Sequence, residues 1–391
     1  MPLRRFSLHF SLAYALMMLG SGVQLPFLPL WLSAKGIGVG GIAAIVAAMS
    51  LVRVVATPGF AWAVDHFGHR RAMIRVSAIL SFLVYASLTV LDGFWPIAAA
   101  CLLAASLFSP IFPLSEGYAV EASAALGLDY GKIRLWASLS FLSGSLGSGW
   151  LLSRLDPLDT AMILAAAMGL CVISTLILPP EPGHMQRREA NENGPSAARF
   201  LLASGFTLFL LTAAIAQSSH GLQNSFSSVY WSSLGYSPGI IGFLWAIAVL
   251  SEVLFFGYSA KLSGRYGPGF FFLAGIIGAV LRWIIAAYAT SLPLIAAGQT
   301  LHAASFAMTH LGTMHMIQRV VPPNLRNRAQ GMHSALSGGL VMAGSIRLSG
   351  PLYDALGAHA FLVMAAMAMF ALAMALMLLR LNPTMRQAAA A

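Results

Sequence analysis

The chain has 391 residues, of which 58% are hydrophobic and 9% are charged, and its mean hydropathy is +0.79. Soluble domains carry about 25% charged residues, so 22 basic and 12 acidic side chains cannot cover the surface of a 41.4 kDa soluble globule. A soluble enzyme and a nucleic-acid-binding module are therefore excluded, in spite of the net charge of +10. The apolar residues must face lipid, and we predict an all-α membrane protein with the bilayer as its solvent.

Twelve stretches of the chain have the roughly 20 mainly apolar residues that a membrane-spanning helix needs. Six lie in the first half, at 8–33, 40–64, 73–91, 95–121, 132–153 and 158–178. Six more follow, at 200–232, 239–262, 269–289, 293–317, 329–350 and 357–380. The polar, Pro- and Gly-containing stretch between them predicts a cytoplasmic linker. We therefore expect a six-helix bundle over 1–178, a linker over 179–199 and a second six-helix bundle over 200–391.

The basic residues predict how the chain is oriented. Sixteen lysines and arginines fall at helix ends on one side, whereas Lys35 and Arg154 fall on the other. Basic residues gather on the cytoplasmic side of membrane proteins, so both termini are expected in the cytoplasm, with the chain in the cell inner membrane. This asymmetry explains the net positive charge without a nucleic acid partner. Cys101 and Cys171 lie in apolar stretches without the spacing of a disulfide or metal site.

Two basic turns indicate that the halves repeat each other. Asp65 opens a turn after the second helix, and Lys261 opens a similar turn after the eighth, 196 residues later. Arg134 and Arg328 begin the fifth and eleventh helices, 194 residues apart. A near-constant offset predicts two pseudo-symmetric parallel repeats, although two basic turns can also be similar by chance.

The residues around the first of these turns resemble a known signature. The stretch from Gly59 to Arg71, GFAWAVDHFGHRR, is similar to the sequence that follows the second helix in the major facilitator superfamily. It differs by having His66, His69 and Ala61 in place of two basic residues and a glycine. The resemblance implies the twelve-helix major facilitator fold. It also implies a gating role at the cytoplasmic side for four residues, Asp65, Gly68, Arg70 and Arg71.

Other stretches resemble the 3-phenylpropionate permeases, namely 128–136, 225–231 and 301–310. That resemblance covers nearly the whole chain and implies an aromatic or other small monocarboxylate as the solute. More distantly, 45–51 resembles the second helix of lactose permease, of the oligosaccharide:proton symporters. On that alignment Glu116 and Arg134 match its sugar-binding carboxylate–arginine pair, and Phe141 matches its stacking tryptophan.

The same alignment reaches the second half of the chain. Glu252, Arg282 and His302 match polar residues of lactose permease, and they imply roles in solute binding and proton coupling. The chain departs from lactose permease at four positions: His220 and Gln223 replace two aspartates, Gln299 replaces a lysine, and Ser305 replaces the proton-carrying carboxylate. The proton route of lactose permease therefore does not transfer to this chain.

The spacing of intramembrane polar residues gives independent indications. A charged side chain in the middle of a membrane costs about 2.5–3.5 kcal/mol, so it usually faces a cavity or a partner. Trp245 and Glu252 are seven residues apart and share a helix face, which suits a ring-containing solute or a proton carrier. A structural pair of Glu252 with Arg282 is the alternative. Arg134 and Phe141 have the same spacing, and Arg134 pairs with Glu116 or anchors the chain to lipid headgroups.

Positive charge exceeds negative charge within the spans. Four arginines, at 53, 134, 282 and 347, stand against two glutamates, at 116 and 252. Guanidinium groups bind carboxylates in a bidentate manner, so this excess favours an anionic solute, with Arg53 a candidate contact. His302 and His220 could carry a proton near neutral pH, or act as neutral bridges between helices.

We therefore predict a monomeric secondary transporter that moves a small organic solute by alternating access. The predicted solute is an aromatic or other small monocarboxylate, carried in symport with protons. A sugar or nucleoside symporter and a proton-coupled exporter are the alternatives. A receptor would need a soluble signalling domain, and paired repeats disfavour a channel. The sequence shows no P-loop, catalytic triad or metal cluster, so we expect no catalytic residues, no cofactor and no metal.

Overall fold

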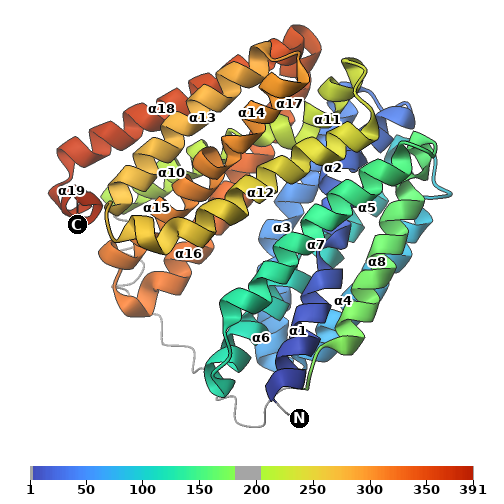
Figure 1. Ribbon diagram of the computed structural model, residues 1–391, viewed down its shortest axis with the longest axis horizontal. Coiled ribbons are helices and arrows are strands. Elements are labelled where there is room, and N and C mark those ends of the chain that lie inside the picture. Colours follow the sequence, from blue (N-terminus) through green and yellow to red (C-terminus); the bar gives the residue numbers. More distant parts are fainter. Residues whose placement is uncertain (1–2, 181–203, 391) are drawn as a thin grey trace. The chain divides into compact units, whose positions relative to one another are not determined.

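The computed structural model describes residues 3–180 and 204–390, and within these ranges every regular element is helical (Figure 1). The predicted all-α membrane fold is confirmed. Seven helices or helical runs are long and apolar enough to cross a membrane by length and composition. Each of the twelve predicted stretches coincides with one helix or with consecutive helices, which is consistent with twelve crossings.

The first half contains eight α-helices within the described residues. Their bounds are α1 Leu3–Met17, α2 Leu19–Ala34, α3 Val39–Phe67, α4 Arg70–Ser87, α5 Phe94–Phe108, α6 Ile111–Leu126, α7 Tyr130–Leu152 and α8 Thr160–Ile177. Two predicted spans are interrupted: 8–33 at Met18, and 95–121 at Ser109 and Pro110. Proline lacks a backbone N–H and therefore removes one hydrogen bond from the helix, which explains the second interruption.

The second half is more irregular. Its α-helices are α10 Ser204–Ser218, α11 Gly221–Ser233, α12 Pro238–Ser263, α13 Pro268–Tyr288, α14 Leu292–Thr300, α15 Thr309–Val320, α16 Arg326–Ala335, α17 Val341–Leu356, α18 Ala360–Leu381 and α19 Pro383–Ala390. Two π-helical segments, η2 Ala303–Met308 and η4 Leu336–Leu340, interrupt predicted spans. The wider π turn is rare and is often found at functional sites.

The chain forms two compact units, which differ from the predicted halves. One unit comprises Met1–Arg188 with Ser227–Ala246, and the other comprises Glu189–Phe226 with Ile247–Ala391. The start of α12 joins the first unit because small residues bring it against α7: a side chain at Gly149 would meet the backbone of Gly239 and Gly242, and Ser145 donates a hydrogen bond of 2.9 Å to the carbonyl of Gly242. The predicted boundaries at 178 and 200 stay predictions, and most of the linker lies outside the described residues.

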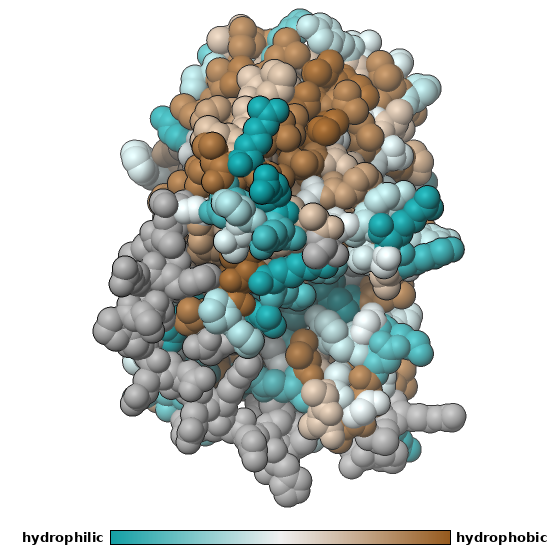
Figure 2. All heavy atoms as spheres, turned by 90° about the vertical axis from the view of Figure 1, so that its left-hand side faces the viewer, coloured by the Kyte–Doolittle hydropathy of each residue, from teal (hydrophilic) through white to brown (hydrophobic). Residues whose placement is uncertain are grey.

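Large apolar side chains remain exposed, as lipid contact requires. Phe370 and Leu381 on α18 are 59% and 75% exposed. On the face drawn in Figure 2, apolar side chains form broad areas separated from groups of polar ones. A soluble protein rarely exposes such large continuous apolar patches.

Glycines on α13 set the position of the polar residues in the second unit. A side chain at Gly275 would collide with Thr309, and one at Gly278 would collide with Ala304. Small residues at helix interfaces allow the backbones to approach closely. Helix α13 therefore lies directly against η2 and α15, and its next turn brings Arg282 to Ser305 on η2 and Gln299 on α14.

Candidate functional site

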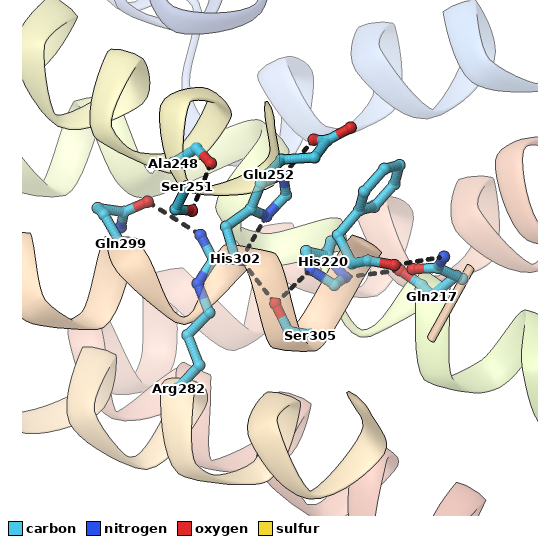
Figure 3. Close-up of polar contacts among 10 residues, drawn as sticks. Gln217, His220, Ala248, Ser251, Glu252, Arg282, Gln299, His302 and Ser305 are labelled. Carbon is cyan, nitrogen blue, oxygen red and sulfur yellow. Dashed lines mark hydrogen bonds and ion pairs between the residues drawn. The ribbon is translucent and has the colours of Figure 1, made fainter. Parts of the chain in front are cut away.

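A fully buried arginine is the centre of a polar network in the second unit (Figure 3). Arg282, on α13, is only 1% exposed. One terminal nitrogen donates to His302 Nδ1 at 2.8 Å and to Ser305 Oγ at 3.0 Å, and the other donates to Gln299 Oε1 at 2.9 Å. All three hydrogen-bond acceptors of Arg282 are neutral side chains. The arginine thus lacks a carboxylate in direct contact among the described residues.

The donor-only chemistry of arginine fixes the protonation of His302. A guanidinium has no acceptor, so His302 Nδ1 must accept, and in the neutral ring the proton is assigned to Nε2. His302 Nε2 lies 3.4 Å from Glu252 Oε2. Arg282 is therefore connected to the Glu252 carboxylate through one neutral imidazole. A proton added at His302 Nδ1 would have to displace the Arg282 hydrogen bond.

The same argument extends to His220, which lies between α10 and α11. Its Nδ1 is 2.9 Å from the backbone carbonyl of Gln217 and therefore carries a proton. Its Nε2 must then accept from Ser305 Oγ, at 3.2 Å. Ser305 accepts from Arg282 and donates to His220, so hydrogen bonds run in one direction from Arg282 through Ser305 to His220.

Aromatic rings enclose this network. The ring of His220 meets the edge of Trp283 with centroids 4.9 Å apart, and Phe306 stacks on His302 at 5.1 Å. Trp283 donates to Ser219 Oγ at 2.9 Å, and the Arg282 guanidinium lies 4.8 Å from its ring centroid. Buried tryptophan and arginine satisfy each other in this way. The site thus combines a cation, two imidazoles and one carboxylate in an apolar surrounding.

The first unit contains a second arginine site, on α6 and α7. Arg134 Nε contacts Glu116 Oε1 directly at 3.0 Å, with side-chain exposures of 40% and 35%. Tyr130 donates its hydroxyl to the same carboxylate oxygen, and the ring centroid of Phe112 lies 5.0 Å from the guanidinium. Glu116 and Arg134 are brought together as the sequence suggested, but the aromatic ring over Arg134 is Phe112. Phe141 lies on α7 and is partly buried. Its backbone carbonyl packs against Gly22 of α2, where a larger side chain would collide with it.

Arg53 occupies the midpoint of α3, fourteen residues from each end of the helix. Its side chain is exposed, and it makes no hydrogen bond or ion pair with any described residue. The buried Tyr85 lies within electrostatic range of Arg53, and its hydroxyl donates to Gln24 Oε1 at 2.9 Å. Fourteen residues correspond to roughly 21 Å of helix, so Arg53 lies far from both ends of α3.

Trp245, the other predicted aromatic contact, is buried at 4% exposure. Its indole N–H donates to Ser228 Oγ at 2.9 Å, and its ring packs against Trp231 with centroids 6.3 Å apart. The residue belongs to the first compact unit, whereas Glu252 belongs to the second. Its indole is thus already used to hold α11 against the start of α12.

The predicted gating residues lie at the adjoining ends of α3 and α4. Asp65 is exposed in the last turn of α3, and Gly68 ends that helix with φ of +73°, a conformation that glycine adopts readily. Arg70 binds the carboxylate of Glu121 through two hydrogen bonds of 2.8 and 3.3 Å. Arg71 donates to the carbonyl of Leu178 at 2.6 Å, where α8 ends. The motif therefore joins α4 to α6 and α8.

Sequence reasoning missed several members of these sites. Ser305 and Gln299 were noticed only as departures from lactose permease, yet they supply two of the three acceptors of Arg282. Their positions three residues before and after His302 gave a weak signal, since such residues share a helix face. Tyr130 and Phe112 carried no signal beyond proximity to Arg134 and Glu116. No group of three metal-ligating side chains occurs in the ranges that the structure describes.

Comparison with known proteins decides the family. The sequence profile of the MFS_1 like family matches residues 5–377. The chain belongs to the MFS_1 like family. It is also 30% identical over 365 residues to the probable 3-phenylpropionic acid transporter of Escherichia coli K12, covering 92% of this chain and 94% of that protein. It is 24% identical to the maltose permease of Geobacillus stearothermophilus, over 85% of this chain and 84% of that one.

Solved structures of transporters share the fold of this MFS_1 like family member. The nucleoside transporter NupG superposes with a TM-score of 0.84 over 96% of this chain and all of that one, at 16% identity. A D-xylose–proton symporter gives 0.75, covering 98% of this chain and 99% of that one, at 14% identity. The protein is therefore a membrane transporter of the major facilitator type and not an enzyme.

Proposed function

We propose that this transporter carries a small organic anion, first of all an aromatic or other small monocarboxylate, together with protons. The relative with 30% identity is named a probable 3-phenylpropionic acid transporter, which supports that solute class. We further propose a monomer in the cell inner membrane with both termini in the cytoplasm. Sugar or nucleoside symport is the second candidate, favoured by the maltose permease and NupG relatives. Proton-coupled export is the third.

The observation that carries the anion assignment is the unpaired Arg53. Arg134 is neutralised by Glu116 at 3.0 Å, and Arg282 is linked to Glu252 through His302. Arg53 alone of these three has neither a carboxylate nor a hydrogen bond among the described residues. A cation deep in the membrane is stable when it faces water or a counter-ion. A solute carboxylate would supply that counter-ion, with Tyr85 within electrostatic range of the guanidinium.

The proton assignment rests on the chain from Glu252 to Arg282. In the arrangement described, His302 is neutral and its Nε2 lies 3.4 Å from Glu252 Oε2. A proton on Glu252 removes the negative charge that balances Arg282, and a proton on His302 Nδ1 displaces Arg282. Either event changes the hydrogen bonds of Ser305 and His220 at the same time. The network thus has two alternative bonding patterns that differ by one proton.

The remaining predicted residues fit secondary roles in this proposal. Arg134 and Glu116 are half-exposed and can exchange their mutual contact for contacts with a solute. Phe141 and Trp245 would flank the apolar body of the solute. Asp65, Gly68, Arg70 and Arg71 would hold helix ends together in one gate state.

The test of the anion assignment is solute binding by purified protein. Wild-type protein in detergent should be stabilised in a thermal-shift screen by 3-phenylpropionate or benzoate, and less by their amides or by sugars and nucleosides. Arg53→Gln should weaken carboxylate binding roughly 10- to 150-fold, because hydrogen bonds to charged groups contribute about 1.5–3 kcal/mol.

Arg347→Gln is the matched control, since Arg347 is also exposed within a span and without a hydrogen bond or ion pair to described residues. It should leave carboxylate binding unchanged. Equal weakening in both variants would mean that overall positive charge attracts the solute and that Arg53 does not bind it. Stabilisation of the wild type by nucleosides or sugars alone would replace the monocarboxylate proposal by the second candidate.

A further inference from the structure

Two histidines continue the aromatic stack beyond the Arg282 network. Phe306 stacks on His302 on one side and on His310 on the other, with centroids 6.2 Å apart and an interplanar angle of 4°. His310 lies on α15, and its ring centroid is 6.3 Å from that of His333 on α16. The described residues thus contain a line of rings from His302 through Phe306 and His310 to His333.

The π-helical segment η2 makes this alignment possible. His302, Phe306 and His310 are spaced four residues apart, and four residues overshoot one turn of an α-helix, which has 3.6 residues. A π turn is wider and needs more than four residues, so it shifts the ring in the opposite direction. Placing η2 at Ala303–Met308 therefore returns His310 to the same face as His302. The stack is a consequence of that irregular turn.

The Glu252 carboxylate lies near both histidines that stack on Phe306. It lies 3.4 Å from His302 Nε2, and it is within electrostatic range of His310. His310 is in turn within electrostatic range of His333. Glu252 and Asp354 are the only carboxylate side chains in described residues 204–226 and 247–390, and Asp354 lies far along α17. A proton that leaves Glu252 within this unit consequently meets imidazole before any other carboxylate.

His310 and His333 each have a ring nitrogen that can accept a proton. Ser337 Oγ donates to the carbonyl of His333 at 2.7 Å, so the 3.5 Å contact of that oxygen with His333 Nε2 places the ring proton on Nε2. His333 Nδ1 is buried and has no hydrogen-bond partner among the described residues, in a side chain only 3% exposed. The ring nitrogens of His310 likewise have no hydrogen bond to any described residue. Buried polar groups normally have partners, and a ligand or water must complete these.

We propose that His310 and His333 form a proton relay between Glu252 and the end of the unit that carries Arg319 and Arg326. This inference rests on the proton coupling proposed above and adds the route by which the proton leaves. The Glu252 O–H bond breaks as its proton passes through a water to one nitrogen of His310, where an N–H bond forms, and His310 releases a proton from its other nitrogen. A bridging water carries that proton to His333 Nδ1, and His333 gives up its Nε2 proton toward Ser337 and water. Each histidine ends neutral, with its tautomer exchanged.

The surroundings of α15 favour passage of the proton over its storage. The helices packed against α15 carry Arg282 on α13, Arg326 and Arg328 on α16 and Arg386 on α19. Of these, Arg282, Arg326 and Arg386 make no hydrogen bond or ion pair with His310 or His333 in the part of the chain that the structure describes. Burial disfavours a lasting charge on an imidazole. His302 is less suited to pass the proton on, because its Nδ1 is held by Arg282. His310 has the carboxylate on one side and His333 on the other.

The experiment measures proton movement and solute movement separately in proteoliposomes that contain a pH-sensitive dye. In wild-type protein, external 3-phenylpropionate at equal pH on both sides should acidify the lumen. His310→Gln should slow that acidification roughly 100-fold, the size of a lost general acid–base group, and leave labelled solute exchange unchanged. His315→Gln, on the same helix, is the matched control and should affect neither measurement.

His333→Gln provides the second variant if His310→Gln does not fold, and the double variant should be no slower than the slower single one because the steps are in series. Full-rate acidification in folded His310→Gln or His333→Gln protein would overturn the relay. Slowing of acidification and exchange together would assign these histidines a structural role. If the wild type exchanges solute without acidification, the proposed proton coupling itself is wrong. That result differs from failure of the relay alone, in which the wild type acidifies the lumen and the histidine variants do so at the same rate.

Discussion

Arg134 and Arg282 are both membrane-embedded arginines with a glutamate nearby, but they reach that glutamate differently. Arg134 touches Glu116 directly and remains half-exposed. Arg282 is buried, and His302 stands between it and Glu252. A direct pair responds to a solute that competes for either partner, whereas a pair bridged by imidazole responds to a proton. The comparison suggests that the first unit is specialised for solute and the second for proton coupling.

The strongest test of this comparison exchanges the two glutamates for glutamine. Glu252→Gln should reduce pH-driven accumulation of solute to the level set by passive equilibration, since no carboxylate remains to accept the proton, yet solute exchange should persist. Glu116→Gln should retain pH-driven accumulation and instead weaken solute binding. Uptake and exchange in proteoliposomes measure both. Undiminished accumulation by Glu252→Gln would remove that residue from the proton route.

Conservative substitution of the arginines should separate the sites further. Arg282→Lys keeps the charge but cannot span three acceptors with a planar fork, and losing two charge-assisted hydrogen bonds predicts a transport rate lower by roughly 100-fold. Arg134→Lys keeps a direct contact with Glu116 and should cost about tenfold or less. Initial rates of labelled uptake compare the two variants. Equal losses would contradict the distinction between a direct and a bridged pair.

Ser305 should contribute to stability as well as to coupling. Ser305→Ala leaves His220 Nε2 without a donor in a buried site and should lower the free energy of unfolding by about 1–3 kcal/mol. Ser81→Ala is a matched control because Ser81 is equally buried and its hydroxyl has no partner among the described residues. Thermal unfolding in detergent should shift for Ser305→Ala and remain in place for Ser81→Ala. A shift of the same size in both would mean that cavity formation dominates.

The gating motif should affect stability less than either arginine site. Arg70→Gln breaks the contact with Glu121, whose side chain is 48% exposed, and exposed ion pairs contribute about 0–1 kcal/mol. Thermal unfolding should therefore change little, although accessibility of cysteine labels placed at the ends of α4 and α6 should change with gate state. A large loss of stability would assign the pair a structural role.

The smallest predicted effect concerns the cap of α7. The backbone N–H of Lys132 lowers the pKa of the Asp129 carboxyl below its ordinary value. Because the folded-state pKa is depressed, the cap contributes above the unfolded pKa and is lost as pH falls through the folded pKa. Hydrogen exchange of the first turn of α7 should accelerate in acid in the wild type. Asp129→Asn should show no such dependence, and an identical acid response would exclude the cap.

Sequence patterns predicted much of the fold because lipid imposes simple rules. Each apolar stretch of about 20 residues became a helix or a run of helices, and turns such as Asp65–Gly68 occurred where glycine and charge predicted them. The resemblance to lactose permease predicts the pairing of Glu116 with Arg134, whereas the position of Arg134 alone also fits an anchor to lipid headgroups. The interruptions near His220 and within 303–308 were not predicted, since helices in a bundle tolerate irregular backbone where neighbours satisfy it.

The sequence by itself determined that this chain is a membrane protein of mostly apolar helices and that a few ionised residues are embedded in them, because the cost of burying charge and backbone polar groups acts on composition alone. Only the tertiary structure decided which of those residues contact one another. Whether Arg282 meets Glu252 directly or through His302 depends on helix rotation and on one π turn, and hydrophobic periodicity does not specify rotations of that size.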